Sequence, residues 1–439
     1  MKNFFLTKRF FYFFWGCVVL FAISLGIPWL LNVVIIGFFV FMASTLTEVL
    51  MLYSRKGIIA VRLLPERFSN GNDNMVHIQF SNSYSFPVKL QVYEDYPVQF
   101  QLRDIGFSLL MARNSEKRLS YSLKPVKRGE YLFGFVNTLT GGPLGLVNRR
   151  YRSCKGDKVA VYPSFIQMRR FELMAISNRL SEIGVKRIRK IGVSTEFENI
   201  RQYVQGDDPR KVNWQATARR GDIMVNSYQD ERSQQVYCLV DKGRVMKMPF
   251  EGMSLLDYAI NASLVLLNTA IVKGDKAGLI TFSNQIGNIV PAEKRPTQMN
   301  KIMEVLYNQK TLYLESDYEK LFATVRLKIS QRSLLLLFTN FESVEGLKRQ
   351  LYFLQLLAKQ HLLVVVFFEN TEISTLLQSY PKTIEDIYIK TIAEKFTLNK
   401  HLIVRELEQF GIQAILCAPE NLTVRVINKY LELKARNLV

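Results

Sequence analysis

Cysteine, histidine and tryptophan are scarce in this chain of 439 residues, which contains 4 Cys, 3 His and 3 Trp. So few cysteines over this length exclude a disulfide-stapled scaffold and agree with a reducing compartment. His77, His361 and His401 lie far apart in the sequence, and none has metal-ligand spacing with a cysteine. The sequence also lacks a Gly-x-Ser-x-Gly elbow and a phosphate-binding Gly-Lys-Ser/Thr loop, so we expect no ATP hydrolysis by this chain.

Acidic residues are outnumbered, with 38 Asp and Glu against 58 Lys and Arg, which gives a net charge of +20. No recognition-helix pattern, zinc-ligand spacing or aromatic RNA-binding signature accompanies this charge, so we do not expect nucleic acid as a partner. An anionic membrane surface is the other partner that suits basic residues, each contributing about 1 kcal/mol. The candidate lipid contacts, which could equally be solvated faces, are Arg149, Arg150, Arg152, Lys186, Arg187, Arg189 and Lys190.

Charge is absent altogether between Phe10 and Thr47. At about 1.5 Å per residue, one helix of this length would be nearly twice as long as a hydrocarbon core of about 30 Å is thick. Gly26 and Pro28 lie in the middle and favour a turn. We therefore predict a transmembrane helical hairpin in residues 1–57, with helices at about 10–26 and 29–53.

Basic residues flank this apolar region on both sides, Lys2, Lys8 and Arg9 before it and Arg55 and Lys56 after it. The positive-inside rule then places both ends of the hairpin in the cytoplasm. A cleaved signal peptide is the competing interpretation, but the apolar run is too long and has no clear small-x-small cleavage site.

Residues 58–165 show the period-two alternation of β-strands, for example at 76–80, 88–93 and 119–123. Turn-forming residues separate these segments, as in Lys127-Arg128-Gly129-Glu130. Several short strands at this spacing predict a small β-sandwich.

Residues 166–232 form a predicted linker, in which turn-forming, charged and aromatic residues lie close together as a sequence signature. Gly206 can supply a positive φ for a turn, Asp208 and Pro209 suit the first positions of a short helix, and Gly221 suits its end. Neighbouring acids and arginines predict local ion pairs. The segment is either a structural connection into the last domain, held by salt bridges, or a docking surface for a partner. Its residues include no nucleophile–base pair for catalysis.

Residues 233–439 alternate apolar strands with helices, which predicts a parallel, doubly wound α/β sheet. Strands are expected at 235–240, 277–282, 333–338, 362–368 and 413–417. Sites in such sheets lie beyond the carboxyl ends of the strands, where Asp241 and Asn340 fall.

The signature resembles the bacterial membrane proteins of the domain-of-unknown-function 58 family, which is associated with MoxR ATPases. The matching residues in the linker are Glu196, Phe197, Arg201, Tyr203, Gly206, Asp207, Asp208, Pro209, Arg210, Asn213, Trp214, Ala216, Ala218 and Arg219. Further similarity lies at Arg128–Tyr131, at Tyr162-Pro163, and in the last segment at Pro419-Glu420 and Lys429–Glu432. The resemblance implies that the last domain is von Willebrand factor A-like.

Such domains often hold a divalent cation in a site that begins Asp-x-Ser-x-Ser. Here Gly243 and Val245 replace both serines after Asp241, Ser316 could stand for the usual threonine, and Asn340 replaces the second acid. A Mg²⁺ site with one remaining carboxylate should be weak, so we expect a degenerate metal site and no cofactor.

The resemblance implies a membrane-anchored, non-enzymatic adaptor that works with a MoxR-type AAA+ ATPase on a client protein that the sequence does not identify. Protein maturation, assembly or envelope stress response is the expected process. The expected location is the bacterial inner membrane, multi-pass, with the soluble domains in the cytoplasm. The alternatives are a metal-dependent adhesion-type module and a hydrolase that uses Asp207, Asp208 and Asp241.

Overall fold

The computed structural model describes residues 3–436 except 25, 27, 55–56, 103–104, 177–195, 206, 230–232, 296, 312, 371–372, 374–376, 378–379 and 382. The chain forms two compact units, Met1–Tyr162 and Pro163–Val439. The four segments predicted from the sequence therefore group differently. The segments 1–57 and 58–165 share the first unit up to residue 162, and 166–232 and 233–439 share the second.

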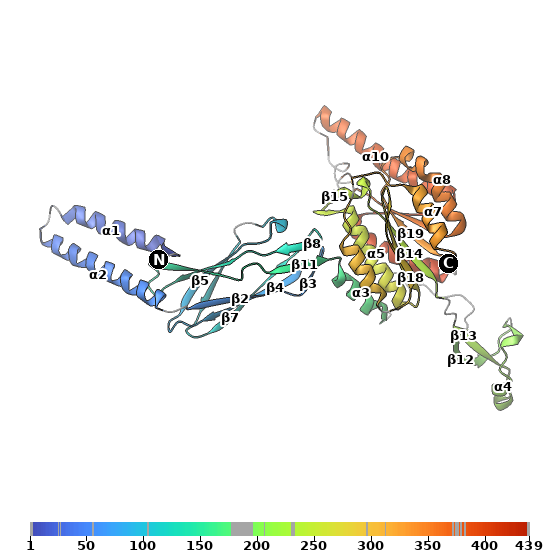
Figure 1. Cartoon of the computed structure of the whole chain (residues 1–439), viewed down its shortest axis with the longest axis horizontal. Helices are drawn as coiled ribbons and strands as arrows, with labels where there is room; N and C mark the ends of the chain where they lie inside the picture. The colour runs from blue at the N-terminus through green and yellow to red at the C-terminus, as the bar shows by residue number, and fades with distance from the viewer. Residues whose placement is uncertain are drawn as a thin grey trace. The chain divides into compact units, whose positions relative to one another are not determined.

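Unit 1 begins with two helices, α1 (Lys8–Ser24) and α2 (Pro28–Tyr53), close to the predicted ranges (Figure 1). They pack against each other through aromatic rings, with the Phe10 and Phe41 centroids 5.2 Å apart. Most of their large apolar side chains are exposed. Within the described residues, two helical stretches are long and apolar enough to cross a membrane, Trp29–Tyr53 and Leu255–Val272. The second is mostly buried inside unit 2, which leaves α2 as the candidate for a membrane span.

The remainder of unit 1 is built from three sheets, with strand orders β1-β10-β9-β5-β6, β2-β4-β7 and β3-β11-β8. The strands are β1 (Phe4–Leu6), β2 (Ile58–Leu63), β3 (Arg67–Ser69), β4 (Asn74–Asn82), β5 (Val88–Glu94), β6 (Gly106–Met111), β7 (Glu116–Leu123), β8 (Gly129–Leu132), β9 (Val136–Gly141), β10 (Val147–Ser153) and β11 (Lys158–Tyr162).

Alternation of buried and exposed residues gives the sheets of unit 1 one apolar face each. Ile78 and Phe80 of β4 share one core cluster with Leu90 and Val92 of β5, which belongs to another sheet. Two sheets therefore pack face to face, as in a β-sandwich. The strand β1 precedes the helices and lies outside the predicted sandwich segment.

A buried carboxylate joins the helices of unit 1 to its sheets. Glu48 is buried and is the one charged residue of α2, and it accepts hydrogen bonds from the backbone N–H groups of Gly145 (2.8 Å) and Leu146 (3.0 Å). Arg149 donates to the carbonyl of Leu52 at the end of α2. Arg149, one of the predicted lipid contacts, is thus used inside unit 1.

Unit 2 is centred on a six-stranded sheet in the order β18-β17-β14-β19-β20-β21. All neighbouring strands are parallel except β18, which runs antiparallel to β17. The strands are β14 (Gln235–Asp241), β17 (Lys276–Phe282), β18 (Ile286–Glu293), β19 (Leu334–Phe338), β20 (Leu362–Phe368) and β21 (Gln413–Cys417).

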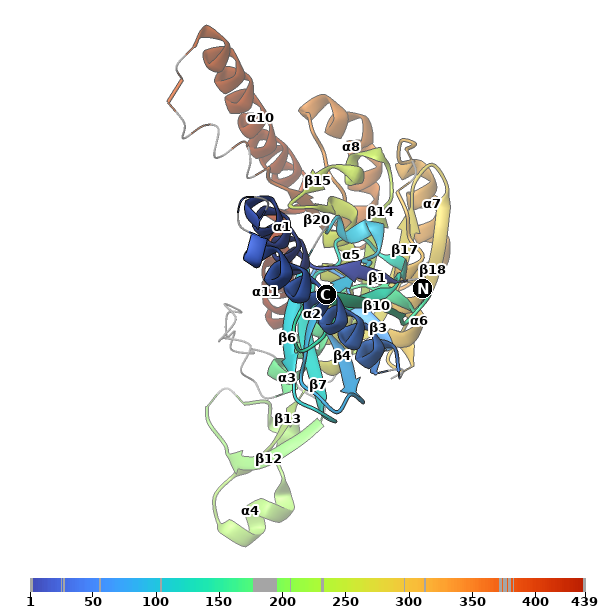
Figure 2. The same ribbon diagram turned by 90° about the vertical axis from the view of Figure 1, so that its left-hand side faces the viewer.

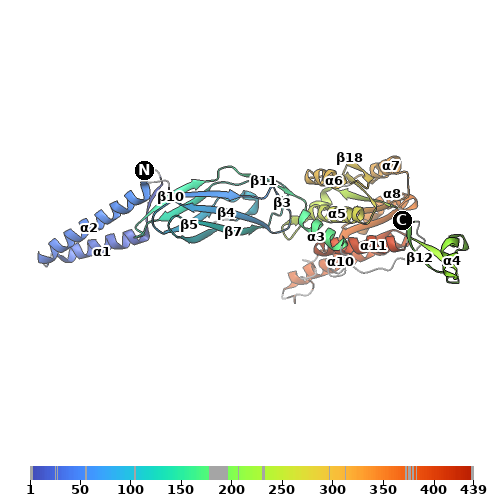
Figure 3. The ribbon, with the colours of Figure 1, turned by 90° about the horizontal axis from the view of Figure 1, so that it is seen from below.

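Helices cover both faces of this sheet (Figures 1, 2 and 3). The helices in contact with one face are α3 (Phe165–Ile176), α5 (Leu255–Val272), α6 (Gln298–Tyr307) and α11 (Leu422–Ala435). Those on the other face are α7 (Tyr318–Lys328), α8 (Val344–Gln360) and α10 (Ile384–Gln409).

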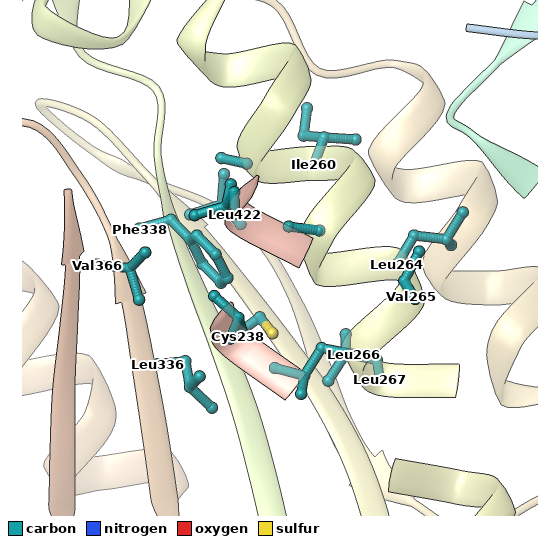
Figure 4. Packing of buried hydrophobic residues seen from close by; sticks show 14 of the residues in the cluster. Cys238, Ile260, Leu264, Val265, Leu266, Leu267, Leu336, Phe338, Val366 and Leu422 are labelled. Atoms are coloured by element: carbon teal, nitrogen blue, oxygen red, sulfur yellow. The ribbon is translucent and has the colours of Figure 1, made fainter. Parts of the chain in front are cut away.

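The central strands are apolar at nearly every position because both of their faces are buried. Cys238, Leu336 and Val366 face α5, as Figure 4 shows. Leu239 and Leu337, one residue further along their strands, belong to the core cluster on the opposite face. The predicted site lies at the carboxyl ends of these strands.

The start of the predicted linker is part of this core. Met168, Phe171 and Ala175 of α3 are buried in the cluster that surrounds α5. Residues 166–176 are therefore a packed helix of unit 2.

Candidate functional site

The carboxyl ends of β14 and β19 lie side by side, because the two strands pair in parallel and Val240 stands opposite Phe338. Asp241 ends β14, and Asn340 follows β19. The loop before α7 brings Ser316 to these strand ends, where it contacts Asp241. The positions of the predicted metal site therefore lie close together, with the exception of Val245, which packs against the apolar core.

The buried carboxylate of Asp241 is surrounded by protein donors. Its Oδ1 accepts from the backbone N–H of Gly243 (2.7 Å) and from the hydroxyl of Ser316. Its Oδ2 accepts from Thr339 Oγ1 (2.7 Å) and from the Tyr318 hydroxyl (3.5 Å). Burial raises the pKa of Asp241 above its ordinary value, and these hydrogen bonds oppose that rise. Donors of the protein itself therefore satisfy the hydrogen-bonding capacity of both oxygens of this carboxylate.

Glycine at position 243 allows this arrangement. A Cβ on Gly243 would lie 2.2 Å from Ser316 Oγ and 3.0 Å from Asp241 Oδ1. The Ser316 hydroxyl thus occupies the space beside Asp241 that a side chain at 243 would need.

The side chain of Asn340 is bound to a lysine. Lys400 of α10 donates from Nζ to Asn340 Oδ1 and to the carbonyl of Phe341, each at 2.6 Å. Burial lowers the pKa of Lys400 to about 8, and the nearby charge of Glu342 opposes this shift. The side-chain oxygen of Asn340, which stands where the metal site would have its second acid, is therefore already bound by a cation.

These residues do not fit a divalent cation. Mg²⁺ requires near-octahedral oxygen ligands, usually with one or two carboxylates free to bind it. Both oxygens of Asp241 accept hydrogen bonds from the protein, and Asn340 is bound to an ammonium group. No cluster of three His, Cys, Asp or Glu that could hold a metal occurs among the residues the structure describes.

The signature residues form a small module of their own. It consists of an antiparallel pair, β12 (Glu196–Gln202) and β13 (Met224–Gln229), with a 3₁₀ turn (Pro209–Lys211) and helix α4 (Trp214–Arg220) between the strands. Arg201 and Asp207 form an ion pair at 2.5 Å, as the charge pattern predicts. Glu196 and Phe197 lie in β12, and Gly206 lies outside the described residues.

Asn213, and not Asp208, caps the helix of this module. Asn213 Oδ1 accepts from the N–H of Ala216 (2.9 Å), and Asn213 Nδ2 donates to Asn226 Oδ1 (2.8 Å) on β13. Asp208 caps the preceding 3₁₀ turn, in which Pro209 is the first residue. Gly221 ends α4 in the left-handed conformation with φ of 80°, which confirms its predicted role.

Trp214, the first residue of α4, is 74% exposed. Val204 and Ile223 are also exposed apolar residues of the module, and the arginines Arg210 and Arg219 are exposed as well. Tyr203 is half-buried. Helix α4 is capped at both ends, and its largest apolar side chain is exposed to solvent.

The three acids of the hydrolase alternative each have a separate structural contact. Asp207 pairs with Arg201, Asp208 accepts from the N–H of Arg210 (3.0 Å), and Asp241 is buried at the sheet. This arrangement offers no nucleophile–base pair among these acids.

Residues 199–375 match the family described as protein of unknown function DUF58. The match covers less than half of the 439 residues. The family resemblance predicted from the signature is thereby confirmed, and the association with MoxR ATPases stays a prediction. The chain is 26% identical over 254 residues to the uncharacterized protein YeaD of Bacillus subtilis, covering 56% of this chain and 61% of YeaD.

Two solved structures are similar to part of this chain. The VWA domain of SpRpn10 has 10% identity and a TM-score of 0.30, covering 44% of this chain and 94% of that domain. The conserved hypothetical protein BatB from Bacteroides thetaiotaomicron has 13% identity and a TM-score of 0.32, covering 46% of this chain and 100% of BatB.

Proposed function

We propose that this protein is a membrane-anchored, non-enzymatic adaptor whose signature module binds a MoxR-type AAA+ ATPase. The observation that carries the proposal is the exposed Trp214 on the capped helix α4. Tryptophan and arginine are the residues most enriched at the energetic centres of protein interfaces. Trp214 is therefore the side chain of this module that a partner surface could bury.

The doubly wound, von Willebrand factor A-like character of the C-terminal domain is part of this proposal. Its support is the parallel sheet with helices on both faces and with Asp241 at the end of the first parallel strand. Because the donors around Asp241 leave no room for metal chemistry, the domain acts as a scaffold that presents surfaces to partners.

Anchoring follows from α1 and α2. Their exposed apolar side chains would be unfavourable in water and are suited to hydrocarbon. We place both helices in the bacterial inner membrane as a multi-pass hairpin. The basic residues Lys8 and Arg9 then keep the start of the hairpin on the cytoplasmic side, together with the sheets of unit 1 and the whole of unit 2.

The test is co-purification of the full chain, in detergent or lipid nanodiscs, with the cognate MoxR-type ATPase. We expect association that Trp214→Ala weakens strongly and that Tyr352→Ala, an exposed aromatic of α8, leaves unchanged. If the wild-type chain shows no association with or without ATP, the proposed partner is wrong. If Trp214→Ala associates as well as wild type, the module is not the binding surface.

A further inference from the structure

Unit 2 contains a cavity next to the strand ends that has no part in the function proposed above. Its volume is about 350 Å³, and its lining includes Phe250, Phe368, Phe396 and Leu416. The cavity lies beyond the carboxyl ends of β20 and β21, which is where ligands bind in open α/β sheets. Its volume falls within the range of about 300–1,000 Å³ typical of small-molecule pockets.

One cation lies in the lining of this apolar cavity. Lys400 is held in place by its two hydrogen bonds to Asn340 Oδ1 and the Phe341 carbonyl. An ammonium group has three N–H donors, so one donor is left over. Within the described part of the chain, Lys400 forms no ion pair and no further hydrogen bond.

Two acids also line the cavity, and Glu342 acts on Lys400 through its charge without a direct contact among the described residues. Glu342 is exposed and Glu369 is half-buried, and neither forms an ion pair with Lys400 within the described residues. The exposed carboxylate of Glu342 is screened by water and salt, whereas Lys400 is partly removed from water. The cavity therefore combines apolar walls with an ammonium group that two neutral acceptors fix in position.

We propose that this cavity binds an apolar group that ends in a carboxylate, with the carboxylate accepting a hydrogen bond from Lys400 Nζ. The apolar body would pack against Phe250, Phe396 and Leu416. The carboxylate would supply a directly hydrogen-bonded anionic partner, which Lys400 does not have among the described residues. Such a group could belong to a free organic acid or to the C-terminus of an apolar peptide.

The experiment uses the full chain in lipid nanodiscs, with empty nanodiscs as the blank, and calorimetric titration. The small probes share one skeleton: 4-phenylbutyrate, 4-phenylbutanol and 4-phenylbutylamine. The peptide probes are N-acetyl-Leu-Leu with a free carboxylate and the same peptide as its amide. A charge-assisted hydrogen bond predicts that each carboxylate binds about tenfold or more tighter than its uncharged analogue.

Three variants separate the contribution of the Lys400 charge to binding from that of the free volume of the cavity. Lys400→Met should reduce the affinity for the carboxylates to that of the uncharged analogues. Lys395→Met, which removes an exposed lysine of α10 outside the cavity lining, should leave binding unchanged. Thr397→Trp fills the cavity, keeps Lys400, and should abolish binding of both acid and alcohol.

Tighter binding of phenylbutyrate than of the peptide acid identifies a free organic acid as the ligand type. The reverse order identifies a peptide terminus. The proposal is overturned if no probe binds, if the alcohol binds as tightly as the acid, or if Lys400→Met binds the acid like wild type. These results are independent of the ATPase association, which uses the signature module.

Discussion

Replacing Asp241 by alanine should destabilise unit 2 without any metal being involved. The carboxylate accepts from two hydroxyls, those of Thr339 and Ser316, and more weakly from that of Tyr318. Hydroxyls can rotate to other acceptors, but the backbone N–H of Gly243 cannot, so it would be left buried without its partner. An unsatisfied buried donor costs about 1–3 kcal/mol, and the lost side-chain packing adds to it. We therefore expect a loss of about 2–4 kcal/mol in the free energy of unfolding.

Asparagine at this position provides the matched control. Its carbonyl oxygen can still accept from Gly243, and its amide can donate to a rotated hydroxyl of Thr339. Asp241→Asn should therefore cost about 1 kcal/mol, clearly less than alanine. Both variants can be compared with wild type by scanning calorimetry of the full chain in nanodiscs, with and without millimolar Mg²⁺.

Behaviour typical of a metal site would contradict this expectation. A metal ligand would make wild type more stable in Mg²⁺, and Asp241→Ala would abolish that gain while changing the metal-free protein little. We expect the opposite, with no shift and no heat on adding Mg²⁺, and a large loss of stability in the metal-free variant.

Three further predictions concern other buried polar groups. His361 is 4% exposed and neither ring nitrogen has a partner among the described residues, and burial lowers its pKa; its protonation therefore favours the unfolded chain, and stability should fall as pH drops below about 6.5, the ordinary histidine value. His361→Phe should reduce this loss of melting temperature between pH 7 and pH 5, whereas the same change at exposed His401 should not. Arg62 pairs with buried Glu94 at 2.7 Å, so Arg62→Met should cost about 3–5 kcal/mol in chemical unfolding by leaving that acid without its counter-ion, with only the Tyr121 hydroxyl still donating to it among the described residues; a loss under 1 kcal/mol would contradict this. Glu48→Ala removes the acceptor of two backbone N–H groups and should lower the melting temperature of unit 1, with Glu48→Gln intermediate.

Much of unit 2 could be predicted because its strands are buried on both faces. Leu334–Phe338 and Leu362–Phe368 are apolar throughout and are separated by a helical segment, so they stand out in the sequence. Strand β18 was missed because it lies at the sheet edge, where Asn288 and Pro291 interrupt the apolar pattern. Strand β1 was missed because three residues are too few to show a period.

The candidate site was predictable only in part. The rule for strand ends brought Asp241 and Asn340 together, since it depends on the topology of parallel strands. Lys400 is 60 residues from Asn340 in the sequence, and no local spacing connects the two. Asp208 and Asn213 are both good capping residues, and in the structure each caps a turn of its own, Asp208 the 3₁₀ turn and Asn213 helix α4.

The most direct test of the adaptor proposal is photo-crosslinking from position 214. A benzophenone amino acid at 214 in the membrane-embedded chain should form a crosslink with the cognate MoxR-type ATPase, and the same group at position 352 should not. Crosslinking at 352 equal to that at 214, or none at 214 while the two proteins co-purify, would contradict the proposal that this module binds the ATPase.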